Sequence, residues 1–262
     1  MRRRAGLRHF ATASALGVAL AAFVPPSAPA AAVALTAQSA DSPDLLFQAR
    51  EPEPVQRAAA LWKARLDRNP GDAEAAWKLA RAHYWLGANS SGTREMRRPH
   101  LEEGIAAARR AVAIAPGAPD GHFWLAANMG LLAELFGRRE GLRYRTDIKH
   151  ALEAALAADP AYLHGSAERA LGRWYATVPG MFGGNKKTGE AHLRASLDLK
   201  RDSAITMVLL AELLLDTGRR DEARGHLAAA LTAPADPDWA PEDQRFKARA
   251  KALLAGLDTR PR

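Results

Sequence analysis

Residues 207–234 read MVLLAELLLDTGRRDEARGHLAAALTAP, and their pattern is the clearest indication of the protein's architecture. Alanine, leucine, arginine and glutamate recur at helical spacing on both sides of Gly218, and Pro234 ends the second half. Both halves are therefore predicted to be helices joined by a turn. No part of the chain shows the alternation of Val, Ile and Thr that is typical of strands, so we expect an all-α protein.

The same pattern of helix, turn, helix and loop occurs four times when the sequence is compared with itself. Each copy begins with a leucine followed by a small residue, and it continues with a second helical phrase. The four leading pairs are Leu79-Ala80, Leu125-Ala126, Leu171-Gly172 and Leu210-Ala211. The sequence therefore predicts four consecutive helical hairpins.

A small residue in the first helix, an alanine or glycine that opens the second and a closing proline resemble the tetratricopeptide repeat (TPR). The resemblance implies an all-α, TPR-like helical-repeat solenoid of about four helix-turn-helix units with N- and C-terminal capping helices. The small residues would let the helix backbones approach closely. Opposite them in the second helices stand Gly104, Ile148, Gly189 and Ala223, of which Ile148 is the exception in size.

These units are longer than the roughly 34 residues of a standard TPR, because their leading leucines are 46, 46 and 39 residues apart. We expect the extra residues to form loops at 87–100, 130–146 and 178–188, between the two helices of a unit. Residues 55–67 and a helix that begins at Pro241 are predicted to cap the two ends. The last helix carries Phe246, Ala250, Leu253 and Leu257 as one apolar stripe, so it should pack on the fourth unit.

Residues 1–32 are predicted to be a secretory signal peptide. A basic start precedes an apolar run at residues 11–24, and small residues precede a cleavage site near Ala30 to Ala32. The apolar run has 14 residues, which is too short for a membrane span of roughly 20. We therefore expect a periplasmic or secreted protein with no integral membrane segment in the mature chain. Its residues 33–54 would be a flexible N-terminus, 55–257 the repeat domain and 258–262 a tail.

Composition limits the class of partner. The 262 residues are 48% hydrophobic and include no cysteine, as in a globular chain without disulfides. The formal charge of +8 falls to +4 when the signal peptide and its four arginines are removed. Basic pairs such as Arg97-Arg98 and Lys186-Lys187 are dispersed among acids, which favours a solvated surface and no nucleic-acid partner.

The sequence holds few groups that point to catalysis. Its histidines are scattered without the spacing of a zinc site, and we expect neither a metal nor another cofactor. The glycine-rich stretch at residues 180–188 lacks the lysine of a phosphate-binding loop, since Asn185 occupies that position. Glu212 and Asp216 lie beside apolar neighbours, where the pKa of a carboxyl group can be raised. They keep open the alternative of a hydrolase that uses a groove carboxylate.

The repeat register also predicts which side chains face the concave groove, because first-helix positions off the packing stripe line it. The candidate ligand or partner residues are Trp77, Arg81, Tyr84, Trp85, Phe123, Trp124, Arg169, Arg173 and Glu212. Val208 and Leu215 are expected on the same face. Aromatic rings with a few arginines suit an apolar ligand with an anionic end, such as a carboxylate, or a hydrophobic peptide. The alternative is that these rings fill the core between helices.

The phrase RALGRWY at residues 169–175, followed by Pro179-Gly180 and GGNKK at 183–187, carries a second resemblance. It resembles the T-components of TRAP transporters and the helical-repeat proteins called regulators of microtubule dynamics, over residues 73–257. The T-component resemblance implies a periplasmic protein that associates with a substrate-binding protein; some members are implied to form homotrimers with a hydrophobic pore. The chain lacks the lipobox cysteine of the lipoprotein members. The loop residues Gly183, Gly184, Asn185 and Lys186 become candidates for partner binding.

These observations predict an exported, non-enzymatic TPR-like binding or scaffold protein. Its partner would be a protein, such as a periplasmic substrate-binding protein, or a small amphipathic ligand held in an aromatic groove. A scaffold for envelope assembly is the alternative within the same class, and the hydrolase is the alternative outside it.

Overall fold

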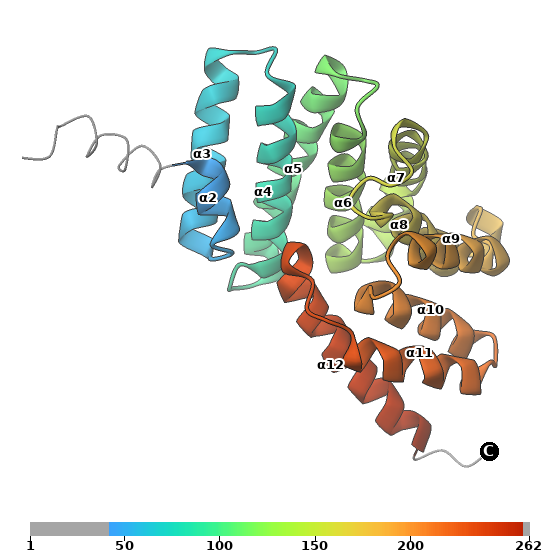
Figure 1. The fold of residues 1–262 in the computed structure, drawn as a ribbon. Coiled ribbons are helices and arrows are strands. Elements are labelled where there is room, and N and C mark those ends of the chain that lie inside the picture. The colour runs from blue at the N-terminus through green and yellow to red at the C-terminus, as the bar shows by residue number, and fades with distance from the viewer. Residues whose placement is uncertain (1–41, 259–262) are drawn as a thin grey trace, which may run out of the picture. The chain divides into compact units, whose positions relative to one another are not determined.

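The computed structural model describes residues 42–258, and within this range the chain consists of helices and their connections, without strands. Eleven α-helices follow one another in this part, with two short 3-10 turns (Figure 1). They are α2 (Pro43–Gln48), α3 (Pro52–Arg68), α4 (Ala73–Asn89), α5 (Arg94–Ile114), α6 (Pro119–Phe136), α7 (Arg138–Ala158), α8 (Ser166–Thr177), η1 (Gly180–Phe182), α9 (Lys186–Leu199), α10 (Ala204–Asp216), α11 (Arg220–Thr232), η2 (Pro237–Trp239) and α12 (Ala240–Asp258). The predicted signal peptide lies outside the described residues.

Four helical hairpins form the body of the fold, as the repeated phrases predict. They are α4 with α5, α6 with α7, α8 with α9 and α10 with α11, and consecutive hairpins pack on one another. Helix α3 covers the first hairpin and α12 covers the last, so both predicted caps are confirmed. None of the helices in the described part is long and apolar enough to cross a membrane.

Polar side chains at the helix starts explain where several helices begin. Asp72, Thr93, Asn185 and Ser203 each precede a helix and accept a hydrogen bond from a backbone N–H in its first turn, over 2.9–3.4 Å. Such N-caps satisfy donors that have no partner within the helix. These four residues therefore help to determine where α4, α5, α9 and α10 begin.

The prediction that extra residues form loops is wrong for the first two units. Only residues 90–93 separate α4 from α5, and Gly137 alone separates α6 from α7, because these four helices are longer than in a standard TPR. Gly87 marks the expected loop start, yet it lies inside α4, where a Cβ would overlap Leu101 of α5. In the third unit the prediction holds, since residues 178–185 connect α8 to α9 through η1.

Small residues of the repeat pattern lie at close contacts between helices. Between α8 and α9, a Cβ on Gly189 would lie 2.9 Å from the Gly172 carbonyl oxygen. In the first units, Gly104 leaves space for the fully buried Asn128, whose Nδ2 donates to the Ala80 carbonyl at 3.1 Å. The amide of Asn128 thus links α6 to α4 beside α5.

The N-terminal boundary differs from the prediction of a flexible segment up to residue 54. Helix α2 lies within it, and α3 begins at Pro52, where proline suits the first turn of a helix. Phe47 of α2 is buried with its ring centroid 5.9 Å from that of Trp62 on α3. Leu46 and Phe47 thus anchor a helix of 6 residues, which is too short for helical periodicity to reveal it.

The chain returns to its first repeat unit at α12. The predicted stripe of α12 packs on α10 and α11. The start of α12 lies near the end of α4 (Figure 1). There Arg245 donates to Asn89 Oδ1 at 3.2 Å and to the Ala88 carbonyl at 3.4 Å. Residues about 156 positions apart therefore meet, and the concave side of the repeats is closed there.

Replacing Gly189 with Ala tests the close contact between α8 and α9. The added Cβ would meet the Gly172 carbonyl oxygen, so we expect the free energy of unfolding to fall by about 1–3 kcal/mol in urea titrations. Gly225→Ala is the matched control, because Gly225 is an exposed helix residue with no neighbour near its Cβ position. It should stabilise by about 0.5–1 kcal/mol through helix propensity. Equal shifts in the two variants would contradict the close contact.

Candidate functional site

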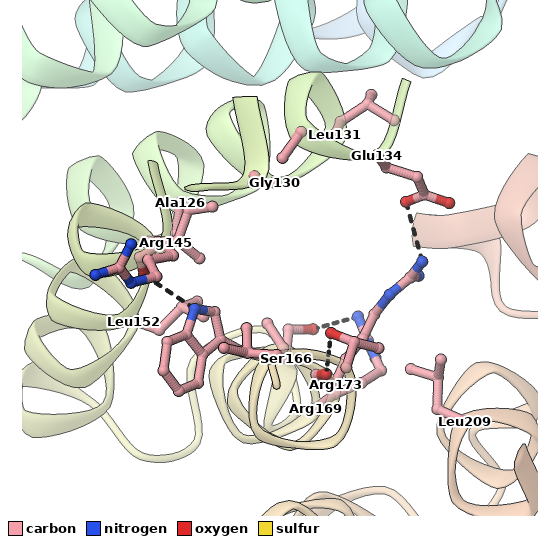
Figure 2. Close-up of a pocket in the computed structure, with 18 of the residues that line it drawn as sticks. Ala126, Gly130, Leu131, Glu134, Arg145, Leu152, Ser166, Arg169, Arg173 and Leu209 are labelled. Atoms are coloured by element: carbon pink, nitrogen blue, oxygen red, sulfur yellow. Dashed lines mark hydrogen bonds and ion pairs between the residues drawn. The ribbon is translucent and has the colours of Figure 1, made fainter. Parts of the chain in front are cut away.

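A cavity of about 600 Å³ lies on the concave side of the second to fourth units. Figure 2 shows Ala126, Gly130 and Glu134 of α6 on one side of this space and Ser166, Arg169 and Arg173 of α8 on the other. Helices α7 and α10 and the segment from Trp239 to Phe246 complete the wall. Its volume lies within the range of pockets for small ligands. We call this space the main cavity.

Aliphatic and aromatic side chains make most of the wall. The apolar members include Phe123, Leu131, Leu142, Ile148, Leu152, Phe182, Ile205, Leu209, Trp239 and Phe246. Ile148, the one large residue among the small packing positions, is thus part of the cavity wall. An apolar molecule placed here would lose contact with water, which is favourable by about 25 cal/mol for each Å² removed.

The guanidinium of Arg169 stands out in this apolar wall. Its side chain is buried, with 8% of the residue exposed, and it makes one hydrogen bond, from Nη2 to Ser166 Oγ at 2.8 Å. Its Cζ also lies 5.2 Å from the ring centroid of Trp239. Burial lowers the pKa of Arg169 from its usual value. Since guanidinium remains charged in proteins, a positive charge is held inside the main cavity.

Arg173 and Arg145 have partners of their own at the cavity wall. Arg173 forms an ion pair with Glu134 of α6 at 3.0 Å, which connects α8 to α6 (Figure 2). Arg145 Cζ lies 5.1 Å from the ring centroid of Phe182, and its carbonyl accepts from Trp174 Nε1 at 2.9 Å. Arg173 therefore braces α8 against α6, whereas the guanidinium of Arg145 lies near the ring of Phe182.

A second cavity of about 150 Å³ adjoins the main one, and Tyr84, Trp239 and Glu242 line both. Its wall comes from α2, α4, α6 and the residues before α8, and includes Phe47, Trp77, Arg81, Trp85, Trp124 and Tyr162. Trp239 stacks on Trp124 with ring centroids 6.0 Å apart. The three shared side chains form the partition between the two spaces.

Arg81 lies among aromatic rings in the wall of the second cavity. Its Cζ lies 4.1 Å from the ring centroid of Phe47 and 5.0 Å from that of Trp77. Asp44 of α2 lies 3.7 Å from its Nη2. Stacking on aromatic faces and a nearby carboxylate both stabilise a guanidinium. Arg81 thus holds α2 against α4.

The structure brings most of the predicted groove residues together. Tyr84, Phe123, Arg169 and Arg173 line the main cavity, and Trp77, Arg81, Tyr84, Trp85 and Trp124 line the second. Glu212 lines neither cavity. In the fourth unit, Ile205 and Leu209 face the main cavity in place of Val208 and Leu215, so the predicted register of that helix is wrong.

The two carboxylates considered for catalysis have cationic partners. Glu212 pairs with Arg249 of α12, and Asp216 pairs with Lys186 at 2.6 Å. Burial raises the pKa of Glu212. Among the described residues, no group of three or more His, Cys, Asp or Glu side chains is placed to hold a metal ion.

The glycine-rich loop has a structural task in this fold. Asn185 caps α9 by accepting from Thr188 N–H at 3.0 Å, and Gly183 adopts a positive φ of 100°. Gly184 packs so closely on the Val178 carbonyl that a Cβ would overlap it. Lys186 lies next to Asp216. The loop places Phe182, just before these glycines, in the cavity wall.

Sequence reasoning missed the part of the site that lies after the fourth unit. Trp239, Glu242 and Phe246 line the main cavity, and Glu242 is buried, which raises its pKa. A tryptophan within a proline-rich connection was the available signal, since an exposed linker seldom carries a large ring.

Four helical hairpins, capped at both ends and enclosing a cavity on their concave side, define a TPR-like helical-repeat protein. A solved structure, that of the TPR protein TTC0263 of Thermus thermophilus, agrees with this class. It has a TM-score of 0.59 at 26% identity, over 81% of this chain and 96% of that chain. The structure of MamA has a TM-score of 0.48 at 16% identity, over 75% of this chain and 92% of its own.

The family follows from the sequence profile that matches the chain. The profile of regulator of microtubule dynamics protein 1-3 matches residues 41–258, nearly the whole described range. The chain belongs to this family. No curated protein matches it.

Substitution of Trp85 and Trp77 tests whether each of these aromatic residues fills the core or is available to bind a ligand. Trp85 is 4% exposed, so Trp85→Ala should lower the free energy of unfolding by about 3–5 kcal/mol. Trp77 is only partly buried, and Trp77→Ala should cost less than half as much. Chemical denaturation of both variants measures this difference. An equal cost would place Trp77 in the core as well.

Proposed function

We propose that this chain is an exported, non-enzymatic binding protein whose main cavity holds an amphipathic ligand. The single observation that carries the proposal is an apolar cavity of about 600 Å³ with a charged guanidinium in its wall. Apolar walls with a few placed polar groups are the usual composition of ligand pockets. The TPR-like fold also supports a role in binding.

Export is part of this proposal and rests on the sequence of residues 1–32. A basic start, a short apolar run and small residues before position 32 are the features of a cleaved secretory signal. In the periplasm, the mature protein would meet amphipathic molecules and other exported proteins.

We further propose a protein partner, in the form of a periplasmic substrate-binding protein, from the resemblance to T-components. The residues that carry this resemblance, 169–175 and 179–187, form one side of the main cavity and the loop beside it. A partner bound there would contact Met181 of η1, which is 85% exposed. No observation favours the hydrolase in the same way, because Glu212 faces Arg249 and lies outside both cavities.

Filling the main cavity tests the proposed function. Gly130 lines the cavity within α6, and no atom lies within 4 Å of the position that its Cβ would take. Gly130→Phe should therefore add its Cβ without a clash and direct a ring into the cavity. We expect the affinity for the uncharged fluorescent probe N-phenyl-1-naphthylamine to fall by at least about tenfold, or 1.4 kcal/mol.

The matched control is Gly225→Phe, which adds the same ring at an exposed position of α11 away from either cavity. It should bind the probe as the wild type does, and circular dichroism should show that both variants are folded. Equal probe affinity in Gly130→Phe and the wild type would contradict the proposed function.

A further inference from the structure

We propose that Arg169 binds the head group of the cavity's ligand, and that this ligand is a single-chain amphiphile with a carboxylate at one end. The inference rests on the proposed function, since it names the ligand class of the main cavity. It starts from a buried charge that has no ion pair with any described residue.

A buried cation without a carboxylate partner is unusual, because removing a charge from water is costly unless another charge compensates it. Two other arginines of the cavity walls follow this rule: Arg173 pairs with Glu134 and Arg81 lies beside Asp44. Arg169 has only a hydroxyl oxygen and the face of Trp239. An anionic ligand would supply the missing negative charge.

The acids around Arg169 are already paired with other cations. Asp236 and Glu242 are the carboxylates whose charge acts on Arg169. Asp236 accepts from Lys200 at 2.7 Å, and Glu242 lies 3.2 Å from Arg245. The immediate surroundings of Arg169 therefore keep its one positive charge in excess, which matches a monoanion. A dianionic phosphate would add a second negative charge beside these two acids.

Ser166 fixes the direction of the Arg169 guanidinium. Its hydroxyl donates to the Leu163 carbonyl at 2.7 Å, so its oxygen is oriented to accept from Arg169 Nη2. Nε and Nη1 have no hydrogen-bond acceptor among the described residues. The planar guanidinium presents such N–H groups in pairs that match the two oxygens of a carboxylate.

The apolar wall suits the hydrocarbon chain of such a ligand. Ile148, Leu152, Ile205 and Leu209 line the cavity and contribute no polar side-chain atom. Leu142 and Phe182 line it as well, and they are 46% and 37% exposed, which places them at the opening to solvent. A ligand whose carboxylate binds Arg169 and whose hydrocarbon chain lies along this wall would match both the charged and the apolar part of the cavity.

The test compares dodecanoate with dodecanol, which have the same chain and differ in charge. Titration calorimetry of the wild type should give tighter binding of dodecanoate than of dodecanol or dodecylamine. In Arg169→Met the preference for dodecanoate over dodecanol should fall by at least about tenfold, as expected when a charged hydrogen bond is lost. Arg194→Met, which removes a paired arginine that lines neither cavity, should keep the preference within about threefold.

The unfolding temperature of the ligand-free protein gives a readout independent of binding. Because Arg169 is buried without a counter-charge, Arg169→Met should leave this temperature unchanged or raise it. Arg169→Lys keeps the charge and loses the paired N–H donors of the guanidinium. It provides a second variant if the methionine variant does not fold, and its preference for dodecanoate should be intermediate.

The outcomes separate this inference from the function on which it rests. Equal preference for dodecanoate in the wild type and Arg169→Met, or tighter binding of dodecanol by the wild type, overturns the role of Arg169 and leaves the cavity function standing. If neither dodecanoate, dodecanol nor the uncharged naphthylamine probe binds the wild type, both proposals are overturned.

Discussion

The packing of Trp239 against the rings of the first two repeats is the interaction on which the cavity depends. Its ring stacks on Trp124 and meets Tyr84 and Phe123 edge to face, with centroids 6.0–6.4 Å apart. It packs against both hydrophobic clusters of the core, one built mainly from α3 to α8 and the other from α9 to α12. Without this contact, the concave side of the repeats would be an open groove, because the segment from Trp239 to Phe246 completes the cavity wall.

Closure of the groove changes the electrostatics of the arginines that line it. In an open groove, water would solvate Arg169 and its charge would contribute little to binding. Inside the cavity the same guanidinium is desolvated and is held in one direction by Ser166. An anion that reaches it would interact in a medium of low polarity, where a charged hydrogen bond is strong. Binding and stability are therefore expected to oppose each other at this residue.

The sequence predicts the local parts of this arrangement and misses the distant ones. The leucines that begin each repeat predict four hairpins, and the small residues Gly172 and Gly189 meet as expected. Eight of the nine predicted groove residues line one of the two cavities. In the sequence, Gly87 favours a loop, yet it lies within α4 because a glycine is needed there for close packing against Leu101. Trp239 could not be placed, because its partner Trp124 lies in another repeat and periodicity carries no information about such contacts.

A crystal structure of the protein with dodecanoate tests the central claim most directly, since it shows the closed wall and the ligand together. We predict one hydrocarbon chain within the main cavity, its carboxylate oxygens within about 3 Å of the Arg169 guanidinium, and Trp239 still stacked on Trp124. An empty cavity, a carboxylate that faces solvent near Leu142, or a Trp239 displaced from the aromatic rings would contradict the account.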